Sequence, residues 1–483
     1  MKATCDLLVI GGGINGTAIA RAAAVAGRKV ILVERDDLAQ GTSSASTKLM
    51  HGGLRYLENY EFRLVHESLT ERGIMLETAR HLVHPLEFRI VHSAEMRPWL
   101  VMRLGLWLYD ILAWRGTLPR SRAIRLEDKA LLNMGGRGFS YWDARVDDAR
   151  LVVANALDAA SCGATILTQT RFLGAERRGD IWAARLATPK GEQEVEAAMI
   201  VNAAGPWAEQ LLSAGFTSQA ASRLRLVKGS HIVVDRCFAG EHAWLLQQPD
   251  GRIVFAIPYQ SDYTLIGTTD EPVDDPADAH ISDAETEYLL GAVNRYRREP
   301  LTRETIRHSF AGIRALYDDG AGSASAVSRD YHLQLDTAGP PLLSVFGGKI
   351  TTARHLADDV MARLGIKGGD TRQRPLPGGD FSTLNELLDT ARHRWPFLTE
   401  DILERMSYAY GTRIALVLGN ARSLSDLGQD FGMGLYAREV DYLIAHEWAL
   451  SAEDIVWRRT KLGLRMSASQ VEVLDAYIGE KRG

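Results

Sequence analysis

CDLLVIGGGINGTAIARAAAVAGRKVILVE, residues 5–34, is the stretch that decides the fold. It opens with a short apolar run that ends in glycines, which predicts a buried parallel strand. An alanine-rich segment then predicts a helix, and the apolar run that ends at Glu34 predicts a second buried strand. Gly11, Gly13 and Gly16 stand in the turn between the first strand and the helix. The stretch therefore predicts a βαβ unit.

The three glycines have the spacing of a dinucleotide-binding turn. Gly11 permits the tight turn, Gly13 lets the backbone approach a pyrophosphate, and Gly16 allows the helix to pack closely on the strand. Glu34 is placed to bind the adenosine ribose hydroxyls, and an acid there disfavours the 2′-phosphate of NADP. Because FAD and NAD use the same turn, the unit alone leaves that choice open.

Other glycine-containing turns indicate the size of the ligand. VNAAGPWA, residues 201–208, predicts a buried strand that ends in small residues, where the backbone can lie close to a ligand. Gly52, Gly53, Gly347 and Gly348 mark two more such turns. With no second fingerprint downstream, the pattern favours one permanently bound, large and flat dinucleotide.

Composition excludes several classes of function. The 483 residues, 46% of them hydrophobic, are enough for two to four domains of roughly 100–200 residues each. A formal net charge of -5 argues against nucleic acid as a partner, because phosphate binding requires an excess of clustered cations. Cys5, Cys162 and Cys237 are too few and too scattered for a disulfide framework or a metal site. The N-terminus lacks the pattern of a signal peptide, so we expect a cytoplasmic protein.

The most apolar run is PWLVMRLGLWLYDILAW, residues 98–114. Arg103 and Asp110 lie inside it and argue against a spanning helix, which needs about 20 apolar residues. Its tryptophans and leucines suit an interfacial helix, with its apolar face in the headgroup region of a membrane. A buried helix of a large domain explains the same run, and the sequence leaves both interpretations open.

A specific resemblance follows from motifs that occur in order along the chain. They are GGGINGTAIA, TSSASTKLMHGGLRYLENYEFRLV, VDDARLV, NAAGPW, LVKGSHIVV, IGTTD, SRDY and LLSVFGGKITT. The sequence resembles the aerobic, FAD-dependent glycerol-3-phosphate dehydrogenases from residue 6 to the C-terminal region, where DFG and WRRTKLGL also match. The resemblance implies FAD as cofactor and oxidation of sn-glycerol 3-phosphate to dihydroxyacetone phosphate. It further implies ubiquinone or another membrane quinone as acceptor, peripheral attachment to the inner face of the cell membrane, and a possible homodimer.

The same resemblance implies an α/β fold with three parts. A discontinuous, Rossmann-like FAD-binding domain is expected over residues 1–95, 140–210 and 336–375. A mixed α+β substrate-binding domain is expected over 96–139 and 211–335. The last part, 376–483, shows amphipathic helical patterns after the linker RPLPGG and predicts an all-helical C-terminal domain.

Oxidation of a secondary alcohol by a flavin requires a base for the hydroxyl proton, and a phosphorylated substrate requires fixed cations. The candidate substrate-binding residues are Arg55, Tyr56, Thr268, Arg314, Arg329 and Lys349. His231 is the first candidate for the base, because an imidazole titrates near neutral pH. Arg314 or Lys349, acting through water, is the competing assignment. One departure from the family pattern is Ala315, which stands where proline often follows the arginine.

The resemblance also implies an extended cofactor site and no metal. Its candidate residues are Gly11, Gly12, Gly13, Ile14, Asn15, Gly16, Glu34, Arg35, Thr42, Ser43, Ser44, Ser46, Lys48, His51, Gly52, Gly53, Phe172, Ala204, Gly205, Gly348, Lys349, Ile350 and Thr351. An ordinary serine-rich turn would look the same as the loop that begins at Thr42.

Two other functions are compatible with parts of this pattern. The first is an oxidase of the same flavin family, which would pass electrons to oxygen. The second is a regulatory protein that binds a nucleotide without turnover. The joint presence of Arg55, His231, Arg314 and Lys349 argues against the second, because a sensor has no need for a base and phosphate-binding cations together.

Overall fold

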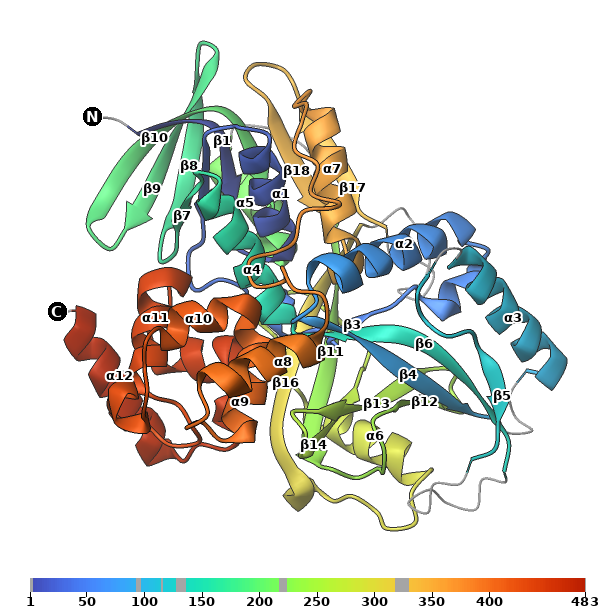
Figure 1. Ribbon diagram of the computed structural model, residues 1–483. Helices are drawn as coiled ribbons and strands as arrows, with labels where there is room; N and C mark the ends of the chain where they lie inside the picture. Colours follow the sequence, from blue (N-terminus) through green and yellow to red (C-terminus); the bar gives the residue numbers. More distant parts are fainter. Residues whose placement is uncertain are drawn as a thin grey trace.

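A computed structural model gives the fold in three parts (Figure 1). Two sheets lie side by side, and a group of helices formed by the C-terminal region packs beside the first sheet and α4. The structure describes residues 3–92, 97–113, 116–126, 136–216, 224–317 and 330–482.

The first sheet contains eight strands of the described chain, in the order β17-β18-β10-β1-β2-β7, with β8 and β9 attached through β10. The strands are β1 Ala3–Ile10, β2 Val30–Val33, β7 Thr165–Leu167, β8 Arg171–Arg178, β9 Ile181–Thr188, β10 Gly191–Asn202, β17 His332–Asp336 and β18 Leu342–Phe346. β18, β10, β1, β2 and β7 run parallel. Helix α1, Ile14–Val25, connects β1 to β2, so the predicted βαβ unit is confirmed.

Both faces of this sheet are covered, which explains why its central strands are apolar without alternation. One face carries α1 together with α4, Asp148–Ser161, and α7, Ala353–Arg363. The alanines of α1 let these three helices lie close together on the sheet. The other face carries α5, Ala208–Gly215, and the antiparallel extension formed by β8 and β9.

The second sheet contains ten strands of the described chain and is mixed. They are β3 Leu49–Met50, β4 Val83–Val91, β5 Arg122–Ile124, β6 Gly138–Val146, β11 Leu224–Asp235, β12 Ala243–Gln247, β13 Ile253–Tyr259, β14 Tyr263–Gly267, β15 Glu271–Val273 and β16 Ile306–Tyr317. Helix α6, Asp283–Asn294, packs on one face, and α2, Phe62–Thr78, with α3, Trp99–Leu112, on the other. β3 and β4 belong to this sheet, although they fall within the range 1–95 expected for the FAD-binding domain. The expected domain boundaries stay a prediction.

The C-terminal region is helical around a core of its own, as predicted. Its helices are α8 Leu384–Arg394, α9 Glu400–Tyr410, α10 Ile414–Leu418, α11 Ala437–Glu447, the π-helix Asp454–Arg459 and α12 Ala468–Arg482. The three parts together confirm the predicted α/β fold with a mixed second domain and a helical C-terminal domain.

Helix α3 accounts for the apolar run that begins at Pro98, while Trp114 lies outside the described residues. The helix is buried on one side only. Leu106 and Tyr109 are buried in the core, whereas Leu104 and Trp107 are 61% and 53% exposed. Within the described ranges, no helix combines the length and the apolar character that crossing a membrane requires. In Figure 1, α3 lies at the edge of the molecule farthest from the C-terminal helices.

Candidate active site

The site begins where the parallel strands of the first sheet end. The last residues of β1, β2 and β10 lie level, because Ile10 pairs with both Val33 and Asn202, and Asn202 pairs in turn with Ser344 of β18. The segments that follow these four strands therefore meet at one edge of the sheet. That edge is where open α/β sheets bind their ligands.

The glycine turn after β1 has no room for side chains at two positions. A Cβ on Gly16 would lie 1.9 Å from the carbonyl oxygen of Gly11, and a Cβ on Gly11 would lie 2.5 Å from the carbonyl oxygen of Ala203. Gly11 also has a φ of 110°, which favours glycine. The turn is thus packed against the end of β10, with the N-terminus of α1 directed to the edge of the sheet.

Glu34 lies beside this turn. Its two carboxylate oxygens accept hydrogen bonds from the backbone N–H of Gly12, at 2.6 Å, and of Asp36, at 3.0 Å. Burial raises the pKa of Glu34, and these two N–H groups oppose the rise. The carboxylate is therefore fixed next to the adenosine end of the predicted site, and each oxygen has a second lone pair for a ribose hydroxyl.

The loop that follows Gly41 ties the turn to the second sheet. Ser43 Oγ accepts a hydrogen bond from Ile14 N, the first residue of α1, at 3.0 Å. Thr42 Oγ1 donates to the carbonyl oxygen of Ile313 in β16 at 2.6 Å. This loop is a specific bridge between the two sheets, and an ordinary serine-rich turn would not need these two contacts.

Lys48 ends that loop as half of a buried ion pair. Its ammonium nitrogen lies 2.8 Å and 2.9 Å from the carboxylate oxygens of Asp148 and donates to the carbonyl oxygen of Ser44 at 2.8 Å. Ser46 Oγ also donates to Asp148 at 2.7 Å. Lys48, Ser44 and Ser46 are among the residues predicted from the sequence, whereas Asp148 is not, although it lies in the motif VDDARLV.

The segment after β10 supplies open space. Gly205 has a φ of 57°, and no heavy atom outside its chain neighbours lies within 4 Å of the place where its Cβ would stand. Arg35 lies over the Trp207 ring, 4.3 Å from its centroid. The Phe172 ring instead stacks on Phe216 in the core below β8, so contact of Phe172 with a cofactor would be through its backbone.

Lys349 follows the glycine turn after β18. Its ammonium nitrogen is buried, lies 4.1 Å from the centroid of the Tyr56 ring, and has no hydrogen-bond partner among the described residues. Asn15 Nδ2 donates to the carbonyl oxygen of Gly347 at 3.0 Å, which ties this turn to α1. Ile350 and Thr351 then begin a short 3-10 turn that leads into α7. His51, Gly52 and Gly53 form the return after β3 that precedes Tyr56.

His231 lies in the middle of β11 and is buried. Its Nε2 lies 3.0 Å from Thr47 Oγ1, its ring stacks on Phe310, and its Nδ1 has no hydrogen-bond partner in the described chain. Burial lowers the pKa of His231 well below its ordinary value, and the charges of Arg314 and Lys48 lower it further. The imidazole is therefore neutral at physiological pH and can accept a proton, but it is a weaker base than the near-neutral histidine expected from the sequence.

Arg314 and Thr268 are neighbours across the ends of β16 and β14. Arg314 Nη2 donates to Thr268 Oγ1 at 2.9 Å, and its Nη1 forms an ion pair with Asp270. These contacts hold the guanidinium in place, and Gly229 leaves the room that it occupies, since a Cβ on Gly229 would lie 2.4 Å from Arg314 Nη2. Asp270 is not predicted from the sequence, although it is the last residue of the motif IGTTD. Ala315 stands where proline often follows the arginine in the family, and Arg314 is nevertheless held by Thr268 and Asp270.

Two candidates cannot be placed. Arg329 lies outside the described residues, and the side chain of Arg55 does too, although its backbone belongs to the 3-10 helix Leu54–Asn59. The other candidates fall into a nucleotide end, around Gly11 and Glu34, and a reactive end. The reactive end combines Lys349 and Tyr56 with the β11–β16 residues, because the turn before Lys349 lies against β16: a Cβ on Gly347 would lie 3.3 Å from the carbonyl oxygen of Ala315.

Three observations fit this edge to a long flavin nucleotide. The glycine turn admits a close backbone approach, the space beside Gly205 is free of side chains, and Lys349 Nζ and Asn15 Oδ1 are buried atoms for which the described residues supply no hydrogen bond. Buried polar atoms normally have partners, so these two indicate a ligand with complementary groups. The fold and the site thus define a dinucleotide-binding oxidoreductase.

Comparison with known families agrees with this class. Residues 6–354 match the family model described as FAD dependent oxidoreductase, and residues 369–479 match the C-terminal domain of alpha-glycerophosphate oxidase. The chain belongs to the FAD-dependent oxidoreductases, in the branch that contains the glycerol-3-phosphate dehydrogenases. Its cofactor is FAD.

Relatives of nearly the same length place it in that branch. It is 47% identical to the glycerol-3-phosphate dehydrogenase of Pseudomonas aeruginosa, covering 98% of this chain and 94% of that protein. It is 43% identical to the aerobic glycerol-3-phosphate dehydrogenase of Escherichia coli, covering 99% and 98%. The D-erythritol 1-phosphate dehydrogenase of Brucella abortus is also 47% identical, covering 97% and 96%. A solved glycerol-3-phosphate dehydrogenase from Bacillus halodurans, complexed with FAD, superposes with a TM-score of 0.76 at 27% identity, covering 99% of this chain and 90% of that one.

Proposed function

We propose that this enzyme oxidises sn-glycerol 3-phosphate to dihydroxyacetone phosphate and passes the electrons to a membrane quinone. The observation that carries the proposal is the near-full-length similarity to dehydrogenases of polyol phosphates, at 43–47% identity. The site supports it, because Arg314 and Lys349 provide fixed cations at the reactive end, where a substrate phosphate requires them.

The chemistry divides between the cofactor and the chain. FAD, when bound, accepts the hydride from the carbon that carries the hydroxyl group. His231 takes the hydroxyl proton, since it is neutral and Thr47 fixes the orientation of its ring. Lys349 stabilises negative charge near the reduced flavin, and Thr268 orients the substrate beside Arg314. In the alternative route, a water molecule held by Arg314 or Lys349 accepts the proton.

The quinone part of the proposal rests on α3. Leu100, Leu104, Trp107 and Ile111 are spaced at three and four residues and are all exposed, so they form one apolar helix face. A lipid-soluble acceptor has to be reached at the bilayer, and an apolar face rich in leucine and tryptophan suits the headgroup region. We propose that this face attaches the enzyme to the cytoplasmic side of the membrane.

A turnover assay on vesicles tests the proposal. The purified holoenzyme is mixed with lipid vesicles that contain a ubiquinone, and glycerol 3-phosphate is added with dioxygen present. The proposal predicts formation of dihydroxyacetone phosphate, matched by quinone reduction, with little hydrogen peroxide. Peroxide equal to the product would instead identify an oxidase, the alternative suggested by the name of the C-terminal family model.

The same assay compares substrates. D-erythritol 1-phosphate is the informative competitor, because one relative of equal similarity carries its name. A higher kcat/KM for erythritol 1-phosphate than for glycerol 3-phosphate would contradict the proposed substrate, while leaving the assignment of the reaction class intact.

A further inference from the structure

The segment that follows Glu34 connects the adenosine end of the site to the C-terminal helices. The segment is tied to the glycine turn by Glu34, whose carboxylate accepts from Gly12 N, and by Ala39 N, which donates to the carbonyl oxygen of Gly12 at 3.1 Å. A Cβ on Gly12 would lie 2.8 Å from side-chain atoms of Glu34 and Leu38. The position of Glu34 thus depends on the course of residues 34–40.

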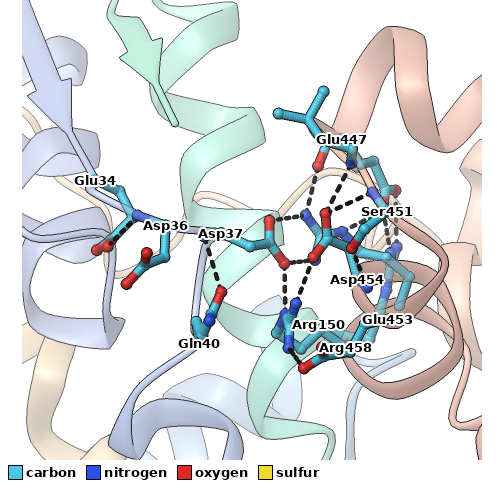
Figure 2. A network of polar contacts seen from close by, with 12 residues as sticks. Glu34, Asp36, Asp37, Gln40, Arg150, Glu447, Ser451, Glu453, Asp454 and Arg458 are labelled. Atoms are coloured by element: carbon cyan, nitrogen blue, oxygen red, sulfur yellow. Dashed lines mark hydrogen bonds and ion pairs between the residues drawn. The ribbon is translucent and has the colours of Figure 1, made fainter. Parts of the chain in front are cut away.

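Asp37 leaves this segment on the side of the helical domain, as Figure 2 shows. Its carboxylate accepts three hydrogen bonds, from Arg458 Nε at 2.6 Å and from Arg459 Nη1 and Nη2, each at 2.8 Å. Asp37 is 1% exposed and Arg459 is fully buried. We call Asp37, Arg458 and Arg459 the Asp37 clamp. It joins two segments that are 421 residues apart in the sequence.

Both arginines of the clamp also bind groups of the helical domain. Arg459 Nη2 also donates to the carbonyl oxygen of Glu447 at 2.7 Å, and the Glu447 carboxylate forms a buried ion pair with Arg150 of α4. Arg458 pairs with Asp454, one turn earlier in the same π-helix. Figure 2 shows this network running from Asp37 into the helical domain. Neither guanidinium can move without breaking several buried contacts.

The carboxylate of Asp37 is paired with two guanidinium groups, and these ion pairs make the clamp rigid. Burial alone would raise the pKa of Asp37, but the charges and hydrogen bonds of Arg459 and Arg458 outweigh burial and hold that pKa below its ordinary value. A bidentate guanidinium–carboxylate contact fixes orientation as well as distance. Packing of the two domains does not by itself require this contact to lie at Asp37, three residues after Glu34, the acid predicted to bind the ribose.

We propose that the Asp37 clamp is a positioning device for FAD, through which the C-terminal helical domain holds Glu34 against the adenosine ribose. Within the described part of the chain, the clamp residues contact the segment that carries Glu34 and the C-terminal helical domain. The C-terminal domain therefore controls how firmly the nucleotide half of FAD is bound, in addition to its own packing. This inference depends on the cofactor and is independent of the substrate.

The test is a measurement of FAD affinity in Arg459→Lys, which keeps the charge but loses the paired hydrogen bonds. The matched control is Arg405→Lys, because Arg405 forms a comparable paired contact with Glu439, inside the helical domain and away from the FAD segment. Apoprotein of each variant is titrated with FAD, and flavin release from the holoenzyme on dilution is followed by the fluorescence of free flavin.

Arg459→Lys is expected to raise the dissociation constant for FAD by about 10- to 100-fold, the range that corresponds to the loss of one hydrogen bond between charged groups. Arg405→Lys should leave that constant close to the parent value, and the rate of flavin reduction at saturating FAD should be close to the parent rate in both variants. An FAD constant for Arg459→Lys that is unchanged, or raised no more than in the control, overturns the proposal. If Arg459→Lys does not fold, Asp37→Asn, which keeps the side-chain size, gives the same comparison.

Discussion

Gly16 is the residue at which the nucleotide turn has least room, since a Cβ there would lie 1.9 Å from the Gly11 carbonyl oxygen. We expect Gly16→Ala to abolish FAD binding and to lower the free energy of unfolding by roughly 1–3 kcal/mol, the usual cost of forcing a methyl group into a packed site. The flavin content of the purified protein and its urea unfolding curve measure both effects.

The control is Gly73→Ala, because Gly73 lies within α2 and no heavy atom is near its Cβ position. It should bind FAD normally and gain about 0.5–1 kcal/mol of stability, since alanine favours a helix over glycine. Equal flavin content in the two variants would mean that the turn tolerates a side chain and that the account of its close packing is wrong.

His231 gives a prediction for pH dependence. Its pKa is held well below the ordinary value of 6.5, so the imidazole stays neutral, and able to accept a proton, as the pH falls through that value. The kcat/KM for flavin reduction should therefore decline only well below pH 6.5, and His231→Gln should lose most of the activity. A decline centred near pH 6.5, or the same pH profile in His231→Gln, would assign the proton to another group.

At this scale the sequence predicts residue types better than their partners. Arg314, Lys349 and His231 could be singled out because they stand near glycines in motifs that resemble those of the family. Asp148 and Asp270 could not, because an ion pair depends on tertiary contacts between segments that are distant in sequence, here 100 residues for Lys48 with Asp148.

Among the elements, α3 carries the prediction for the membrane. Leu104→Glu combined with Trp107→Glu places charges on its exposed face without touching the core. Burial of such side chains contributes about 1.5–3 kcal/mol each, so binding to vesicles should fall at least about tenfold. Cosedimentation with vesicles of anionic and zwitterionic lipids measures it.

The matched control is Val473→Glu, which changes an exposed apolar residue on α12. It should sediment with vesicles like the parent enzyme, and flavin reduction by the substrate should be normal in all variants. Full vesicle binding by the α3 double variant would remove α3 as the attachment site.

The elements predicted from sequence are those whose signal is local. The β1–α1–β2 unit is contained in about thirty consecutive residues, and its apolar runs, helix and glycines agree with one another. The membership of β3, β4 and β6 in the second sheet is different, because strand pairing there joins Val83–Val91 to β6 and β12, which begin at Gly138 and Ala243. Alternation along a strand shows that it lies in a sheet without showing which sheet.

For the whole molecule, the ion pair between Arg150 and Glu447 joins the FAD-binding part to the helical domain. Glu447→Gln keeps the size of the side chain but leaves two buried guanidinium groups, Arg150 and Arg459, without that charge. Breaking a buried pair typically costs about 3–5 kcal/mol, and we expect a loss of that order in chemical unfolding of the holoenzyme.

Glu453→Gln is the control, because Glu453 is largely exposed and contacts Arg458 at 3.3 Å. An exposed pair contributes about 0–1 kcal/mol, so its unfolding curve should change little. Similar curves for the two variants would show that the buried pair does not hold the domains together.

We expect glycerol 3-phosphate to reduce the FAD of this protein, and an anaerobic titration measures that reaction without any acceptor. The absorbance of the oxidised flavin is followed while glycerol 3-phosphate is added to the holoenzyme, with glycerol and D-erythritol 1-phosphate as comparisons. The expected result is stoichiometric bleaching by glycerol 3-phosphate and none by glycerol, which lacks the phosphate that we propose Arg314 and Lys349 bind. A flavin that stays oxidised with glycerol 3-phosphate would contradict it.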